Sequence, residues 1–174
     1  LPGAGTDPSA IAILGNKIYV ANASTQNVAV IEENRVTQFI PVGRNPAALA
    51  ADPAGKRVYV SNTGDKTISL ITNDQVALTQ SIGAESRALL FFENRLFAAL
   101  DSKDGILVLD PATLQTTARI DIPNIFTVIS IAGDPVHHRI YANLYDKTAV
   151  IDSTTLRVSA VLPTKGSYEM LLAY

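Results

Sequence analysis

The chain has 174 residues, of which 47% are hydrophobic and 17% charged, and its formal net charge is −2. It contains no cysteine, which excludes a disulfide scaffold, a thiolate zinc site, an iron–sulfur cluster and a cysteine nucleophile. Charges of both signs are scattered along the chain and no apolar run is long, so we expect no nucleic-acid partner and no membrane insertion.

Four segments of about forty residues repeat the same order of features along the chain. Each segment contains a basic residue followed by a β-branched or aromatic run. These basic residues are Lys17, Arg57, Arg95 and Arg139. Apolar runs before and after each of them keep the same spacing, which indicates an internal repeat.

The first segment, residues 8–45, contains four apolar runs separated by polar turns, which predicts four short strands. The runs are 8–13, 17–21, 28–31 and 36–42. Gly15 can adopt a positive φ at the first turn, so the first two strands are expected to form a hairpin. The second segment, residues 46–85, repeats this order.

The third segment, residues 86–125, includes a stretch that helix propensity alone would assign to a helix. The repeat instead predicts two strands within residues 86–100, with Glu93 and Asn94 as their turn. The fourth segment, residues 126–166, is expected to open with an inner strand at residue 126.

Four strands joined by hairpins form a small antiparallel sheet that cannot bury both of its faces alone. Sheets of this kind stack radially in β-propellers. We therefore predict an all-β chain in which residues 1–174 form one β-propeller segment of about four four-stranded antiparallel blades, with residues 167–174 as the inner strand of a further blade. The expected blades are 8–45, 46–85, 86–125 and 126–166. A parallel β-helix or a β-sandwich is the competing all-β fold.

Two strings in the first half of the chain resemble a known repeat. Residues 19–22 read Tyr-Val-Ala-Asn and residues 59–62 read Tyr-Val-Ser-Asn, and Ile-Pro-Val-Gly stands at 40–43. These strings are similar to the YVTN family of β-propeller repeats, from which the third and fourth segments depart. The resemblance implies an exported or surface-layer propeller, often of seven blades, and some relatives carry a modified haem or another redox cofactor.

An open arc of four blades would leave an apolar face bare at each end. At about 25 cal/mol per Å², exposing some 500 Å² of such surface forgoes roughly 12 kcal/mol, which is comparable to the whole stability of a typical domain. We therefore expect a larger ring of six to eight blades, completed by further blades of the same chain or by another chain. The start at Leu1 instead of Met is consistent with an exported, extracytoplasmic protein of the periplasm or cell surface.

No pattern in the chain indicates a phosphate-binding loop or a nucleophile with its base. His137 and His138 form the single histidine pair. Neighbouring residues on a strand point to opposite faces, so the two could not readily share one metal ion, although one of them could ligate a haem iron from a loop. We interpret them as residues of the turn before Arg139 and expect no metal or cofactor. Function in propellers usually lies on the loops that lead into the inner strands. We expect ligand contacts there, from Arg44, Asn45, Glu85, Arg87, Asn124 and Tyr168.

These features favour a non-catalytic interaction or structural module. Its expected partner is a protein, a glycan or the cell wall, bound through the channel-face loops. The alternative is a redox propeller associated with haem or quinone, or a hydrolytic propeller, with cofactor or catalytic ligands partly outside this chain.

Overall fold

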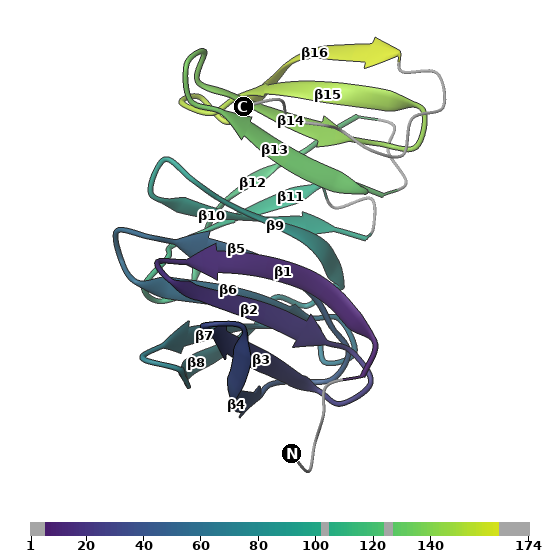
Figure 1. The fold of residues 1–174 in the computed structure, drawn as a ribbon. Helices are drawn as coiled ribbons and strands as arrows, with labels where there is room; N and C mark the ends of the chain where they lie inside the picture. The colour runs from purple at the N-terminus through teal and green to yellow at the C-terminus, as the bar shows by residue number, and fades with distance from the viewer. Residues whose placement is uncertain (1–5, 102–104, 124–126, 164–174) are drawn as a thin grey trace.

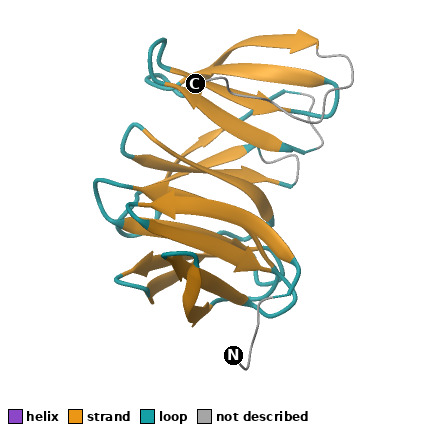
Figure 2. Cartoon of the chain, viewed as in Figure 1, coloured by secondary structure: helices purple, strands orange, loops and turns teal. Residues whose placement is uncertain are grey.

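A computed structural model describes residues 6–101, 105–123 and 127–163 of the chain. All regular structure in these ranges is β-strand, connected by short turns (Figure 2). No helix in this part of the chain is long and apolar enough to cross a bilayer.

The strands form four separate antiparallel sheets, each made of four strands that are consecutive in the chain. The first two sheets contain β1 (Pro8–Leu14), β2 (Lys17–Asn22), β3 (Asn27–Glu32), β4 (Arg35–Pro41), β5 (Pro46–Asp52), β6 (Arg57–Asn62), β7 (Thr67–Thr72) and β8 (Gln75–Ser81). The last two contain β9 (Ser86–Phe92), β10 (Arg95–Leu100), β11 (Ile106–Leu109), β12 (Thr116–Ile120), β13 (Ser130–Asp134), β14 (Arg139–Asn143), β15 (Lys147–Asp152) and β16 (Arg157–Pro163). We call these sheets blades 1 to 4.

The blades stack in chain order as an arc. Strand β1 packs beside β5, β5 beside β9, and β9 beside β13, so the first strand of each blade is the inner one. Figure 1 shows blades 1 and 2 at one end, blade 3 in the middle and blade 4 at the other end. The two terminal blades therefore lie far apart in this arc.

Three apolar clusters hold neighbouring blades together. Tyr19 packs with Val58 and Val60 between blades 1 and 2. Tyr59 lies in the cluster between blades 2 and 3, and Phe97 in the cluster between blades 3 and 4. The same repeat position therefore supplies a large ring to each boundary, as expected for residues that fill the space where blades diverge.

The turns follow the chemistry of their residues. Gly15 has a φ of 63° at the turn between β1 and β2. Glu93 and Asn94 have φ of 46° and 58°, and they close the two-residue hairpin between β9 and β10. The carboxylate of Asp110 accepts hydrogen bonds from the backbone N–H groups of Ala112 and Thr113, at 2.9 and 2.8 Å. The prediction of two strands within residues 86–100 is confirmed.

The inner strand of the fourth blade is shorter than the apolar run that predicted it. The strand starts at Ser130, residues 127–129 are not in a strand, and residue 126 lies outside the described residues. Val128 lies two residues before the strand, and its side chain is buried in the core between blades 3 and 4. This stretch of chain therefore contributes to the core although it is not part of the sheet. The predicted inner strand at residues 167–174 lies outside the described residues.

The outward side of blade 1 has no neighbour among the described blades. Ile11 and Ile13 of β1 are 66% and 64% exposed. Leu89 in blade 3 occupies the same repeat position as Ile11 in blade 1, but it is only 9% exposed because blade 2 covers it. The repeat thus presents on blade 1 the apolar side that is covered in the interior blades.

Candidate functional site

The edge of the arc that carries the blade-connecting loops contains four of the polar residues predicted from sequence, Arg44, Asn45, Glu85 and Arg87. We call this edge the loop face. It is formed by residues 42–45 and 82–85, by the turn at 63–66 after β6, and by Asp101 after β10. Arg44 is held there by Asp65, with Nε 2.5 Å from Oδ1 and the backbone N–H 2.7 Å from Oδ2. Its Nη2 donates to the Gly64 carbonyl at 3.0 Å. These hydrogen bonds, first from the backbone and then from the side chain of Arg44, hold the pKa of Asp65 below its usual range.

A second arginine is held in the same way one blade further on. Arg87 donates from Nε to Asp101 at 2.8 Å, and its Nη2 lies 3.3 Å from Glu85. Asn45 instead donates to the hydroxyl of Thr63 at 2.7 Å. The structure therefore joins the predicted residues to nearby partners, and does not gather them around one cavity.

The remaining two predicted contacts, Asn124 and Tyr168, lie outside the described residues.

The opposite edge, which we call the turn face, carries the turns between the first and second and between the third and fourth strands of each blade. Side chains at the start of each second strand reach across to the next blade there. The Tyr19 hydroxyl donates to Asp74 at 2.6 Å, and the Tyr59 hydroxyl to the Pro111 carbonyl at 3.0 Å. Arg95 donates to the Ser153 carbonyl at 2.9 Å. These bonds link consecutive blades in a repeated direction.

A Glu, a His and a Ser meet on the turn face between blades 3 and 4. His138 Nδ1 lies 2.6 Å from one oxygen of Glu93, and the Ser153 hydroxyl donates to the other at 2.7 Å. The hydrogen bond from Ser153, followed by that from His138, holds the pKa of Glu93 below its usual range. The carboxylate therefore separates the hydroxyl from the imidazole, whereas a hydrolytic triad places the imidazole next to the nucleophile. This cluster is a connection between blades.

His137 also has a structural role, since its Nδ1 lies 2.7 Å from Asp134 in the turn before β14. This agrees with the interpretation of the histidine pair as turn residues. Within the described ranges, no group of three or more His, Asp or Glu side chains is placed to hold a metal ion.

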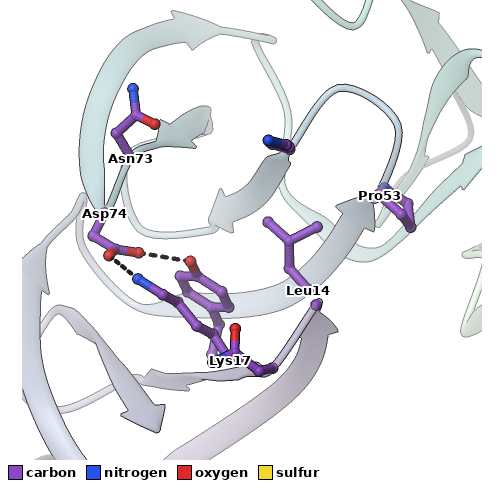
Figure 3. A pocket seen from close by; sticks show the side chains of 9 residues that line it. Leu14, Lys17, Pro53, Asn73 and Asp74 are labelled. Atoms are coloured by element: carbon purple, nitrogen blue, oxygen red, sulfur yellow. Dashed lines mark hydrogen bonds and ion pairs between the residues drawn. The ribbon is translucent and has the colours of Figure 1, made fainter.

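A pocket of about 320 Å³ opens on the turn face between blades 1 and 2 (Figure 3). Three turns surround it, and its walls combine apolar, amide and charged side chains. The lining residues are Leu14, Gly15, Asn16, Lys17, Tyr19, Pro53, Lys56, Asn73 and Asp74. Sequence analysis did not predict this pocket, because the turns that form it are separated by tens of residues.

Asp74 is the centre of the polar network in this pocket. It accepts from the Tyr19 hydroxyl and pairs with the Lys17 ammonium, as the dashed lines in Figure 3 show. Lys17 also lies 2.8 Å from Glu32. Partial burial would raise the pKa of Asp74, but the hydrogen bonds from Lys17 and Tyr19 outweigh it and lower that pKa. The hydrogen bonds to Asp74 and Glu32 raise the pKa of Lys17, so the ion pair is charged at neutral pH.

The lowered pKa of Asp74 predicts a pH-dependent contribution to stability. Because the folded state favours the ionised carboxylate, the contribution is present above the unfolded pKa and is lost as pH falls through the folded pKa. We expect Asp74→Asn to lower the free energy of unfolding by about 1–2 kcal/mol at pH 7. The difference from the native chain should shrink towards zero in acid, measured by urea unfolding across this pH range.

The exposed carboxylate of Asp121 provides the control for this measurement. Asp121→Asn is expected to match the native chain at both pH 7 and acid pH. A difference between Asp74→Asn and the native chain that stays constant down to the most acidic pH would contradict the assignment of the effect to the charge of Asp74.

Many solved structures are similar to this chain, and two of them match it over nearly its whole length. Hydrazine synthase of Kuenenia stuttgartiensis matches with a TM-score of 0.85 and 18% identity, covering 94% of this chain and 51% of that one. Glutaminyl cyclase of Myxococcus xanthus matches with a TM-score of 0.66 and 13% identity, covering 92% of this chain and 72% of that one. Both are β-propeller proteins. This chain has a β-propeller fold.

At these identities the matches show the fold alone. The chain spans about half the length of the hydrazine synthase chain. No protein-family model matches it, and no curated protein is similar in sequence.

Proposed function

We propose that this β-propeller segment is a non-catalytic interaction module that binds a protein or glycan partner through its loop face. The observation that carries the proposal is the fixed presentation of two arginines there. The side chains of Arg44 and Arg87 are 67% and 55% exposed, yet each is held by a carboxylate. Binding to side chains that are already ordered loses less conformational entropy, which favours recognition.

The polar groups of the loop face also suit a partner of mixed polarity. Arg44 and Arg87 lie beside Asp65, Asp101 and Glu85, so the positive groups are accompanied by acceptors. Protein edges and glycans present both donors and acceptors, and rims of interfaces are polar in this way. We infer further that the repeat is of the YVTN type and the protein extracytoplasmic, on the Tyr-Val-x-Asn strings of β2 and β6.

The bare side of blade 1 supports the inference that further blades, of the same or another chain, complete the ring. Ile11 and Ile13 are exposed at positions that interior blades cover. The hydrolytic alternative gains no support from the Glu93, His138 and Ser153 cluster, because the cluster lacks the order of a catalytic triad.

Charge reversal on the loop face tests the proposed function. Arg44→Glu combined with Arg87→Glu is expected to reduce co-sedimentation with insoluble peptidoglycan, or capture by a purified cell-surface protein, by about tenfold or more. The matched control reverses two exposed positive charges elsewhere, Arg35→Glu with Arg157→Glu, and should bind as the native chain does.

Circular dichroism of each variant would establish that its fold is retained. Binding that survives reversal on the loop face and is lost in the control would contradict the proposal. A Soret band or stoichiometric metal in the native protein would overturn the non-catalytic assignment in favour of the redox alternative.

A further inference from the structure

The pocket between blades 1 and 2 results from a difference in turn length between blades. In blade 3 a longer turn joins the third and fourth strands and carries Leu114, which is fully buried between blades 2 and 3. The corresponding turn of blade 4 carries Leu156, which packs against the core between blades 3 and 4. Blade 2 has only Asn73 and Asp74 between β7 and β8, so no leucine enters the boundary with blade 1.

Backbone conformation shows that these two leucines are held in place. Leu114 and Leu156 have φ of 57° and 58°, a region that is unfavourable for a residue with a branched side chain. The backbone N–H of Leu114 donates to the backbone carbonyl of Asp110, and that of Leu156 to the backbone carbonyl of Asp152, both at 2.9 Å. The turns of blades 3 and 4 thus direct an apolar side chain inward, whereas that of blade 2 directs the carboxylate of Asp74 to Tyr19.

The pocket is close to neutral in charge and rich in groups that can exchange hydrogen bonds. Lys17 and Lys56 balance Asp74, which lines the pocket with them, and Glu32, which pairs with Lys17 beside the lining. An anion would meet the carboxylate of Asp74, and a cation would meet the two ammonium groups, so the charges favour a neutral ligand.

The remaining polar groups of the pocket lie at its mouth. The side chains of Asn16, Lys56 and Asn73 are exposed, and the structure gives them no hydrogen-bond partner among the described residues. An amide offers both donors and acceptors, and an ammonium group offers three donors. Leu14 and Pro53 provide apolar surface beside them (Figure 3).

The volume limits the size of the ligand. Pockets for small molecules usually measure about 300–1,000 Å³, and this one is at the small end of that range at about 320 Å³. A pyranose ring carries hydroxyl groups, which can exchange hydrogen bonds with the amides, and C–H groups, which can pack on the apolar walls. We propose that the pocket binds one residue of a neutral saccharide. This site is separate from the loop face and does not depend on the function proposed for that face.

The test is a titration of the ¹⁵N-labelled native chain with glucose, galactose, mannose, xylose and N-acetylglucosamine, followed by NMR. At least one of these sugars is expected to shift the backbone amides of Gly15, Asn16, Lys56 and Asn73 in a saturable way, with a Kd of about 1 mM, corresponding to about −4 kcal/mol. The absence of a saturable shift with all five sugars would overturn the proposal. Glucuronate and inorganic phosphate are the anionic probes, and stronger shifts with either than with every neutral sugar would also overturn it.

Two lysines in the same backbone conformation provide matched variants. Lys56 has a φ of 52° and lines the pocket, whereas Lys66 has a φ of 55° and lies on the other edge of blade 2. Glycine tolerates this conformation, so both substitutions should fold. Lys56→Gly is expected to weaken sugar binding by about fivefold or more, the loss of a hydrogen bond to a charged group, and Lys66→Gly to leave it unchanged.

Equal binding by Lys56→Gly and the native chain would contradict the placement of the sugar in this pocket. The loop-face variant with Arg44→Glu and Arg87→Glu should bind the sugar normally, so this result is independent of the outcome for the proposed function.

Discussion

Replacing Tyr59 with alanine is expected to lower the free energy of unfolding by about 3–5 kcal/mol, the usual cost of removing a large buried ring. Tyr59 is fully buried between blades 2 and 3, where its ring stacks on Phe91 with 6.0 Å between ring centroids. Burial raises the pKa of Tyr59 to about 12, so the hydroxyl is neutral at pH 7. Urea unfolding followed by far-ultraviolet circular dichroism measures the change, since the chain has no tryptophan.

The Tyr59→Phe variant distinguishes the contribution of the ring to stability from that of the hydroxyl. It keeps the stacking but leaves the buried Pro111 carbonyl without its hydrogen bond, which should cost about 1–3 kcal/mol. A Tyr59→Ala variant as stable as Tyr59→Phe would show that the ring does not hold the two blades together.

Leu114→Ala is expected to lower the free energy of unfolding by about 2–4 kcal/mol. Leu114 is fully buried, and its removal would leave between blades 2 and 3 a hollow at the position where the natural pocket lies between blades 1 and 2. The measurement is again urea unfolding.

Leu114→Gly provides an unusual control. Glycine normally destabilises a strand or helix relative to alanine, but Leu114 has a φ of 57°, where glycine avoids a strain of about 1–2 kcal/mol. We therefore expect Leu114→Gly to be more stable than Leu114→Ala. The reverse order would contradict the left-handed conformation at this turn.

The strand order could be predicted from sequence because it depends on local patterns that recur. Apolar runs and turn residues identified the blades, and the repeat correctly overrode helix propensity across β9 and β10. The start of β13 was predicted too early, because Val128 has the apolar character of a strand residue but is buried ahead of the pairing.

The candidate sites were less accessible to sequence reasoning. Arg44 and Arg87 were predicted as ligand contacts, but their ion pairs with Asp65 and Asp101 depend on how a loop and a neighbouring turn approach each other. The contact between Tyr19 and Asp74 joins residues of different blades, and its geometry depends on the angle between the sheets.

One signal of the pocket was present in the sequence. The turn after β7 is shorter than those after β11 and β15, and it lacks the leucine that both of them carry. Comparison of turn lengths between repeats could therefore have identified the boundary between blades 1 and 2 as the one left unfilled.

The central claim is that consecutive blades pack face to face through the large ring of each second strand. Nuclear Overhauser effects between the ring protons of Tyr59 and Phe91 test it most directly, because these residues belong to blades 2 and 3 and stack in this structure. The account predicts observable cross-peaks, of weak to medium intensity, between the two assigned rings. Assigned rings without such cross-peaks, with Tyr59 in contact only with its own sheet, would contradict it.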